Sequence, residues 1–206
     1  MTTKILRLGI IILAILLVAG ASLLFFLNRS ALFSEDFSSG EASGFKIING
    51  IWSVVDDGSG NKVLEGNGGQ ITFGPDLEDF NLKLRIKIIQ GSDPVDIYFR
   101  KHLYEFYTLF IHPNESIVDL AFVTVNPPQP WSIEHIKVPV YTVKSGQWAT
   151  VRIEAVDDQI KVFIDGFELI NVTNSKLRNG IFGINCDNDS IVQIDDIIIT
   201  HPGVYD

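Results

Sequence analysis

The chain has 206 residues, with 16 Lys or Arg, 25 Asp or Glu and a formal net charge of −9 at pH 7. This length holds one β-sandwich-sized domain plus a short appendage. Three of the basic side chains lie in the first 30 residues, so residues 31–206 carry 13 basic and 25 acidic side chains, a balance of −12. Sequence-independent binding of nucleic acid needs a basic surface, so the composition argues against it. The only cysteine, Cys186, excludes an internal disulfide.

The appendage is an uncharged apolar segment, Leu8–Leu27, preceded by two basic side chains. About 20 apolar residues in a helix span the roughly 30 Å of a bilayer core, which predicts a transmembrane signal anchor within residues 1–30. The alternative is a signal peptide cleaved near Ala19–Ala21, although the apolar run continues beyond that point. The preceding positive charges favour an inside N-terminus. The domain of residues 31–206 is therefore expected outside the cytoplasm, anchored to the cell membrane or secreted.

After the appendage, apolar and polar residues alternate over short runs separated by turn residues. Such patterning predicts β-strands with one buried and one solvated face. Gly66–Gly69 is predicted to be a loop, and Asn126–Pro130 is a break that no central strand tolerates. The strands predicted in this part are Phe33–Phe37, Trp52–Asp56, Lys62–Glu65, Gln70–Phe73, Phe80–Ile88, Val95–Arg100, Tyr104–Ile111, Ile117–Val125 and Ile133–Val138.

The last sixty residues contain the clearest hairpin pattern. Two-residue breaks occur at Asp157-Asp158 and at Asp165-Gly166, and Asp-Gly is a strong signal for a type I′ hairpin turn. With these, the chain has about thirteen strands, no standard helix after the appendage and no repeat, which predicts one all-β antiparallel sandwich. The strands predicted here are Trp148–Ala155, Ile160–Ile164, Phe167–Val172, Gly180–Asn185 and Val192–Ile199.

A series of short motifs follows one order along the chain. The motifs are Glu35-Asp36-Phe37, Trp52-x-Val54, Asp57-Gly58, Val63-Leu64-x-Gly66, Phe80-x-Leu82-x-Leu84-x-Ile86, Ile97-x-Phe99-Arg100, Tyr107-x-Leu109-x-Ile111, Gly146-x-Trp148-x-x-Val151, Val162-x-Ile164-Asp165-Gly166, Gly180-x-x-Gly183 and Ile194-Asp195-Asp196-Ile197. Their order resembles the concanavalin A-like lectin/glucanase superfamily, in particular its laminin-G-like and 3-keto-disaccharide hydrolase (family 16 glycoside hydrolase-related) domains. The resemblance implies a jelly-roll β-sandwich whose concave face often holds carbohydrate. Members bind glycans, mediate adhesion or process glycosides, and fold alone does not choose among these functions.

Catalytic motifs are weak in this sequence. Family 16 glycosidases place paired carboxylates on alternate positions of one strand, and retaining hydrolysis needs the two about 5–5.5 Å apart. The nearest string here, Glu154 to Asp158, puts Glu154 and Asp157 on opposite strand faces, with both aspartates in a predicted turn. No Gly-x-Ser-x-Gly elbow is present, and the four histidines are scattered. The sequence assigns no catalytic residue, and the balance is against an enzyme.

Strand parity predicts a ligand-binding face instead. Asp96, Tyr98 and Arg100 share one side of their strand, and the family's core parity places Phe106, Thr108 and Phe110 on the same side of the next. Aromatic rings beside polar groups suit sugar recognition, because the rings stack on C–H faces while polar atoms orient hydroxyls. Trp131 is a further candidate. The alternative is that these are ordinary sheet aromatics, with Arg100 paired to Asp96 or Glu105.

Two sets of charged residues are further candidates for ligand binding, one basic and one acidic. Lys83, Arg85 and Lys87 alternate on one strand and suit an anionic glycan, but a solvated face balanced by acidic neighbours such as Glu154 is favoured. Related jelly rolls often hold a structural Ca²⁺ where the first and last strands meet. The resemblance makes Asp36 and Asp195 candidate oxygen ligands there; otherwise they are exposed carboxylates on edge strands.

Three functions follow from these observations. The favoured one is a surface-anchored or secreted, lectin-like module that binds carbohydrate or a cell-wall polysaccharide. The first alternative is an enzyme of the 3-keto-disaccharide hydrolase type, with Asp96, Arg100 or Glu105 near the reacting centre. The second is a non-catalytic adhesion domain with an envelope protein as its partner.

Overall fold

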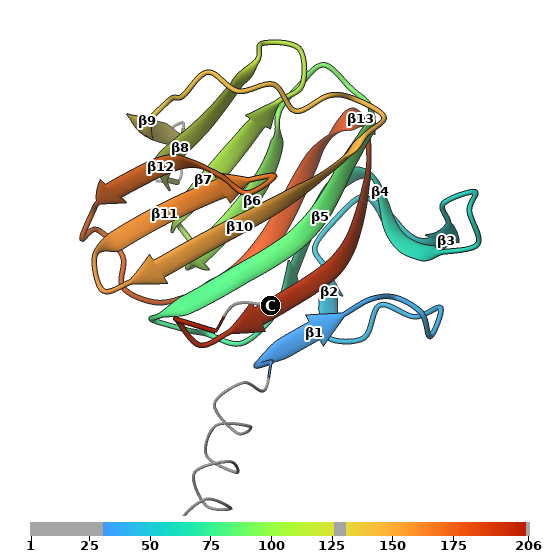
Figure 1. Cartoon of the computed structure of the whole chain (residues 1–206), viewed down its shortest axis with the longest axis horizontal. Coiled ribbons are helices and arrows are strands. Elements are labelled where there is room, and N and C mark those ends of the chain that lie inside the picture. Colours follow the sequence, from blue (N-terminus) through green and yellow to red (C-terminus); the bar gives the residue numbers. More distant parts are fainter. Residues whose placement is uncertain (1–30, 126–130, 205–206) are drawn as a thin grey trace, which may run out of the picture.

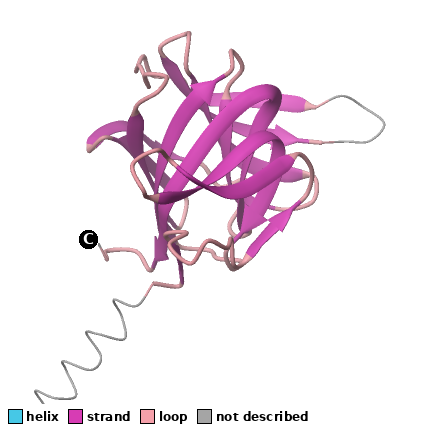
Figure 2. Cartoon of the chain, turned by 90° about the vertical axis from the view of Figure 1, so that its right-hand side faces the viewer, coloured by secondary structure: helices cyan, strands magenta, loops and turns pink. Residues whose placement is uncertain are grey.

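The structure is a computed structural model that describes residues 31–125 and 131–204. Every regular element in these residues is a β-strand (Figure 2), which confirms the all-β antiparallel class. No helix within the described ranges is long and apolar enough to cross a membrane. The segment predicted as a signal anchor, residues 1–30, lies outside the described residues, as does the proline-rich break at Asn126–Pro130.

Thirteen strands are described. They are β1 (Phe33–Glu35), β2 (Phe45–Ile47), β3 (Ile51–Asp56), β4 (Lys62–Phe73), β5 (Phe80–Gln90), β6 (Val95–Lys101), β7 (Glu105–His112), β8 (Ile117–Thr124), β9 (Ser132–Lys137), β10 (Trp148–Val156), β11 (Gln159–Ile164), β12 (Phe167–Thr173) and β13 (Ile181–Thr200). Most begin and end within two residues of the predicted runs.

The strands form two layers that share β13 (Figure 1). In the front layer the order is β12-β11-β10-β5-β13, and in the rear layer it is β13-β6-β7-β8-β9. Residues 181–185 of β13 pair with β6, whereas residues 191–200 pair with β5. β4 follows β13 on its other side through both parts. The twenty residues of β13 therefore run from one layer into the other.

Two segments that were predicted to interrupt strands lie inside continuous strands. The loop predicted at Gly66–Gly69 continues β4, and the gap predicted over residues 186–191 continues β13. The two strands pair on both sides of this stretch, with a register shift within it. Gly68 and Gly69 have φ angles of 65° and 98°, in the left-handed region that favours glycine. The glycines thus bend a continuous strand and do not end it.

One strand, β2, was not predicted, because three residues are too short for an alternating pattern. It pairs with β4, placing Phe45 opposite Phe73. The ring of Phe45 lies 5.7 Å from that of Phe33, 5.6 Å from Phe37 and 5.2 Å from Phe73. Such aromatic pairs contribute about 0.5–1.5 kcal/mol each beyond burial. Tertiary packing therefore holds β2 in place.

The core lies between the layers. Leu84 and Ile153 from the front layer and Ile97 and Leu109 from the rear layer are fully buried members of one hydrophobic cluster. Burying each such side chain stabilises the fold by about 1.5–3 kcal/mol. Since inward residues form the core, the alternate residues form two outer surfaces. We call the outward side of β5, β10 and β11 the front face, and the outward side of β6 to β9 with residues 181–185 the rear face.

Candidate functional site

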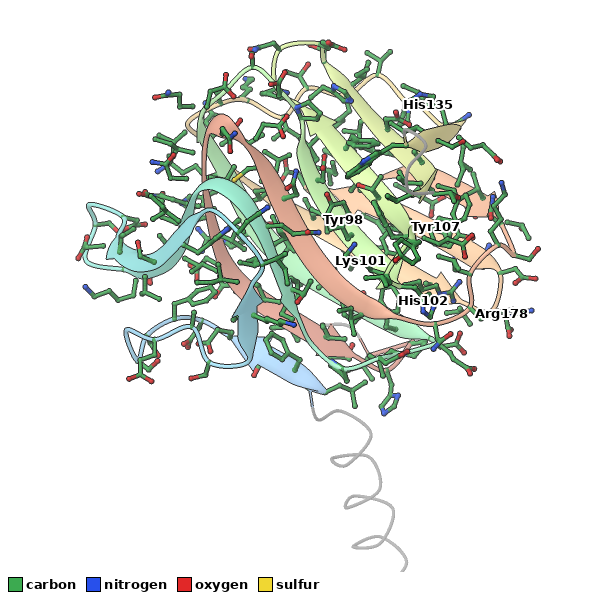
Figure 3. The ribbon with its side chains drawn as sticks, turned by 180° about the vertical axis from the view of Figure 1, so that it is seen from behind. Tyr98, Lys101, His102, Tyr107, His135 and Arg178 are labelled. Carbon is green, nitrogen blue, oxygen red and sulfur yellow. The ribbon has the colours of Figure 1, made fainter. Side chains whose placement is uncertain are left out.

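The rear face carries two neighbouring rows of side chains, each crossing several strands. Figure 3 views this side of the molecule and labels Tyr98 and His135. Strand pairing places the residues of each row side by side. The first row consists of Asn185, Asp96, Phe110 and Asp119, and the second of Gly183, Tyr98, Thr108, Ala121 and His135. Polar groups from five strands therefore meet on one surface.

Asp96 is the centre of the first row. The Tyr98 hydroxyl and the Asn185 amide Nδ2 each donate a hydrogen bond of 3.1 Å to its Oδ2 atom. Its Oδ1 atom is buried and has no hydrogen-bond partner. Only 7% of Asp96 is exposed, and this burial raises the pKa of the carboxyl to about 7, although both hydrogen bonds oppose the rise. The desolvated carboxyl therefore keeps its proton to a higher pH than an exposed aspartate does.

Two more polar atoms of these two rows are buried and lack a hydrogen-bond partner, Thr108 Oγ1 and Asp119 Oδ1. The other oxygen of Asp119, Oδ2, lies 2.5 Å from Nδ1 of His135. A buried polar atom without a partner costs about 1–3 kcal/mol, so such atoms are rare in stable folds unless water or a ligand satisfies them. Together with Asp96 Oδ1, they form a group of three unsatisfied atoms on adjacent strands.

Aromatic rings border this group. The rings of Tyr98 and Phe106 meet edge to face at 4.7 Å, and Trp131 stands edge-on to Phe106 at 6.2 Å. Tyr98 and Phe106 are each only 2% exposed, whereas Trp131 is 59% exposed. The Lys101 ammonium lies 5.1 Å from the Tyr98 ring centre and 4.2 Å from that of Phe106. Lys101 and Trp131 therefore shield the rings beneath them.

Gly183 allows the Tyr98 ring to lie where it does. A Cβ atom at this position would come within 3.3 Å of the Tyr98 ring and 2.7 Å of the backbone oxygen of Ile71. On the other side of Gly183 lies Thr72 of β4, which borders a cavity of about 440 Å³. Lys101 lines this cavity as well. The Lys101 side chain therefore separates the buried aromatic rings from an open hollow, and its burial lowers the pKa of its ammonium.

Five of the six predicted ligand-binding residues do share the rear face. Pairing and packing bring together Asp96, Tyr98, Phe106, Phe110 and Trp131. Whether they bind a ligand stays a prediction. Thr108 lies on this face as parity predicted. Asn185, Asp119, His135 and Lys101 also lie there and were not predicted, because their placement depends on strand register or, for Lys101, on the φ angle of Arg100.

Arg100 does not lie on this face, so that prediction is wrong. Its φ of 46° interrupts the alternation of β6, and the side chain is fully buried. The guanidinium donates hydrogen bonds of 2.8–3.1 Å to the carbonyl oxygens of Glu78, Asp157 and Leu177. Asp79, at 3.8 Å, is its ion-pair partner, in place of the expected Asp96 or Glu105. Arg100 thus joins loops of the front layer to the rear layer.

The predicted calcium ligands have separate partners. Asp36 Oδ1 accepts a hydrogen bond from the Ser38 amide, and Asp195 Oδ2 accepts one from Asn61 Nδ2. Asp195 is only 2% exposed and lies 3.5 Å from Arg85 Nη1, so it is not the exposed carboxylate of the alternative interpretation. Within the described ranges, no group of three or more His, Cys, Asp and Glu side chains is arranged to hold a metal. Calcium binding stays a prediction.

The two-layer fold places this chain with concanavalin A-like sandwiches, as its motifs predicted. The 3-keto-alpha-glucoside-1,2-lyase-like domain matches residues 32–200. The chain therefore belongs to this domain family. A search of curated proteins returns no match.

Solved structures share the fold at low sequence identity. A carbohydrate-binding module, CBM66 from Bacillus subtilis, is 19% identical with a TM-score of 0.64, over 76% of this chain and 95% of that one. A β-glucanase from Bacillus licheniformis is 11% identical with a TM-score of 0.59, over 83% and 98%. Domain 4 of AbnA, a GH43 extracellular arabinanase from Geobacillus stearothermophilus in complex with arabinotriose, is 16% identical with a TM-score of 0.56, over 84% and 92%.

Proposed function

We propose that this protein is a carbohydrate-binding module that holds a sugar on its rear face. The observation that carries the proposal is the group of three buried unsatisfied oxygen atoms, on Asp96, Thr108 and Asp119, beside aromatic rings. Sugar hydroxyls are suitable partners, because they donate to carboxylates and exchange hydrogen bonds with a threonine hydroxyl. The fold shared with a carbohydrate-binding module and with an arabinanase domain bound to arabinotriose supports this class of ligand.

Each part of the face has a role in this proposal. Trp131 offers an exposed ring on which the C–H face of a sugar stacks. Asp96 Oδ1 and Asp119 Oδ1 accept hydrogen bonds from hydroxyls, and His135 fixes the orientation of Asp119. Within the described residues, the only partners of the Lys101 ammonium are the Tyr98 and Phe106 rings. Rotation of its side chain uncovers the Tyr98 and Phe106 rings for the C–H face of a sugar.

We further propose that the module acts outside the cytoplasm, attached to the cell membrane by residues 1–30 or released if that segment is cleaved. Its ligand would then be a polysaccharide of the cell wall or the surroundings. This location rests on the charge and hydropathy of the N-terminal sequence. Fractionation of cells that express the full-length chain, followed by protease treatment of intact cells, tests it: degradation of a membrane-bound form supports the proposal, and full protection contradicts it.

The binding test compares two exposed aromatic residues. The full-length chain is applied to a glycan array, and a binding sugar is then titrated against Trp131→Ala and Phe167→Ala. Phe167 is 65% exposed on the hairpin of the front layer and is the matched control. We expect Trp131→Ala to weaken binding by up to about tenfold, because an aromatic contact contributes about 0.5–1.5 kcal/mol, and Phe167→Ala to leave the affinity unchanged. An empty array together with specific capture of an envelope protein would favour the adhesion alternative.

One observation favours a second candidate function, cleavage of a 3-keto-glycoside. The family name describes a 1,2-lyase acting on such a sugar, and a ketone at C3 makes the hydrogen on C2 acidic. A base removes this proton, the C2–H electrons form a C1=C2 double bond, and the C1–O bond breaks with its electrons on the leaving oxygen. In this candidate function the base is Asp96, whose pKa is raised to about 7.

Asp96→Asn separates the two functions. The amide keeps an acceptor oxygen for Tyr98 and Asn185 but cannot take a proton. If the protein is an enzyme, wild type releases an unsaturated keto sugar from a 3-keto-glucoside, and Asp96→Asn binds the sugar without releasing it. If wild type binds the keto sugar and leaves it intact, the enzymatic candidate fails and the binding module stands.

A further inference from the structure

A cavity of about 300 Å³ opens on the front face, on the opposite layer from the site described above. It lies over β5, β10 and β11 and the end of β13. Its volume is at the lower end of the range for small-molecule sites, about 300–1,000 Å³. The lining residues used below are Asn81, Lys83, Arg152, Phe163 and Ile198.

Strand pairing brings two cations together in this cavity. Lys83 of β5 lies directly opposite Arg152 of β10, and both point outward. Ile198 flanks Lys83 on one side, and Phe163 flanks Arg152 on the other. Like charges directly opposite each other on one face destabilise a sheet. An anion bound between them would relieve this repulsion.

The two cations differ in how they are held. Arg152 forms an ion pair with Glu154, and its guanidinium lies 3.7 Å from the Phe163 ring centre. Glu154 therefore offsets one positive charge. Lys83 has no ion-pair partner among the described residues. The cavity thus has a net positive charge in a protein whose overall charge is −9.

The cavity also offers a hydrogen-bond acceptor and an apolar wall. Asn81 donates from Nδ2 to the backbone oxygen of Val204 at 2.9 Å, which fixes the orientation of its amide. Its Oδ1 atom is buried without a partner, and the whole residue is only 6% exposed. Ile198 supplies the apolar surface. A simple inorganic anion uses neither the acceptor nor the wall.

We propose that this cavity binds a carboxylate-bearing sugar residue, a uronic acid. Lys83 and Arg152 hold the carboxylate by charge-assisted hydrogen bonds. Asn81 Oδ1 accepts a hydrogen bond from a ring hydroxyl, and Ile198 contacts the C–H face of the ring. The site is separate from the rear face, so the proposal does not depend on sugar binding there.

The test uses tri-galacturonate as the probe and its methyl ester as the neutral counterpart, each titrated calorimetrically into the full-length chain at low salt. We expect saturable binding of the acid, and binding about tenfold weaker for the ester and for Lys83→Gln, because charge-assisted hydrogen bonds are about twice as strong as neutral ones. Lys83→Arg keeps the charge and is expected to retain binding. Acetate at matched ionic strength is expected not to compete.

Lys87→Gln is the matched control. Lys87 lies on the same strand and the same side as Lys83, but contacts the Trp148 ring at 5.7 Å and does not line the cavity. We expect it to leave the affinity within about twofold. Equal losses in Lys83→Gln and Lys87→Gln would mean general charge attraction and overturn the proposal, as would equal binding of the ester or no saturable binding by wild type. Thr108→Val on the rear face is expected to leave this binding unchanged, which separates the two sites.

Discussion

The rear and front faces arise from the same alternating pattern but differ in charge and accessibility. On the rear face, the carboxylates of Asp96 and Asp119 are 7% and 3% exposed. On the front face, the cations of Lys83 and Arg152 line an open cavity. Parity shows which side chains point away from the core. The neighbouring side chains decide how far solvent reaches them: on the rear face, Lys101 and Trp131 both contact the ring of Phe106, which is only 2% exposed.

This difference in burial sets the chemistry of each face. Desolvation disfavours a charged carboxyl, so Asp96 behaves as a hydrogen-bonding group with a pKa near neutral. Front-face cations keep contact with water and act through charge. The rear face therefore suits a neutral ligand rich in hydroxyls, and the front face suits an anion.

The largest expected effect is a loss of stability that concerns the whole fold, because Arg100 connects the two layers. Arg100→Leu removes a buried guanidinium that joins the carbonyls of Glu78, Asp157 and Leu177. Because these oxygens lose a charged donor, we expect the free energy of unfolding to fall by about 3–5 kcal/mol, measured by urea denaturation. Arg178→Leu, at an arginine whose side chain is 54% exposed, is the control and is expected to cost under about 1 kcal/mol. A small loss for Arg100→Leu would mean that water replaces the guanidinium.

The second prediction concerns pH and the rear face alone. The pKa of Asp96 is raised to about 7 from its ordinary value of 3.8. Between these values the unfolded chain has lost the proton and the folded protein keeps it, so stability falls as pH rises from about 4 to 7. Asp96→Asn has no ionisable group at this position, so this pH-dependent loss of stability is absent from the variant. We expect the variant to match wild type near pH 4 and to exceed it by about 2–4 kcal/mol near pH 8.

Urea denaturation at a series of pH values measures this difference. Burial also raises the pKa of Asp187 and Asp195, which remain in wild type and variant. Asp195 cancels in the comparison, whereas the charge of Asp187 contributes to the raised pKa of Asp96 and so forms part of the measured difference. A constant offset between the two proteins across pH 4–8 would show that Asp96 titrates normally in the folded state.

Much of the fold could be predicted from local sequence. In Phe80–Ile88 each apolar residue follows a polar one, so the strand and its buried face are visible without any neighbour. The turn at Asp165-Gly166 is equally local, since both residues take the positive φ angles, 51° and 84°, that a type I′ turn needs. The glycines of β4 were misread because a glycine that bends a strand and one that ends it look alike in sequence.

The site was less predictable because it depends on register and on one dihedral angle. The pairing of Asp119 with His135 requires the alignment of β8 with β9. Strand alternation predicted that Arg100 points to the rear face. Because its φ angle is positive, the side chain points to the loops instead, and Lys101 lies over the Tyr98 ring. A non-glycine residue in that conformation costs energy that only its tertiary hydrogen bonds repay, and those partners are far away in sequence.

The third prediction is that one substitution on the rear face, Thr108→Val, raises stability and lowers sugar affinity. Thr108→Val replaces a fully buried hydroxyl that has no partner with a methyl group of similar shape. We expect the ligand-free protein to gain about 1 kcal/mol of stability, while its affinity for a rear-face sugar falls severalfold. Thr150→Val on the front face is the control for both measurements. A loss of stability in Thr108→Val would indicate that bound water already satisfies the hydroxyl.

The smallest expected effect concerns the front face. Arg85 pairs with Asp196 at 3.0 Å and with Asp195 at 3.5 Å, and its side chain is 34% exposed. Because solvent screens such a pair, Arg85→Gln is expected to lower the free energy of unfolding by about 0.5–1 kcal/mol. Lys87→Gln, at the next cation of the same ladder, is expected to have almost no effect.

The pH dependence of this small loss identifies its origin. Burial already raises the pKa of Asp195, and loss of the neighbouring guanidinium raises it further. The cost of Arg85→Gln should therefore grow as pH rises and Asp195 ionises, and shrink in acid, where the carboxyl is neutral in both proteins. A cost that stays constant with pH would assign the loss to the contact of Arg85 with the Trp148 ring, 4.6 Å away. The front face would then be held by packing more than by charge.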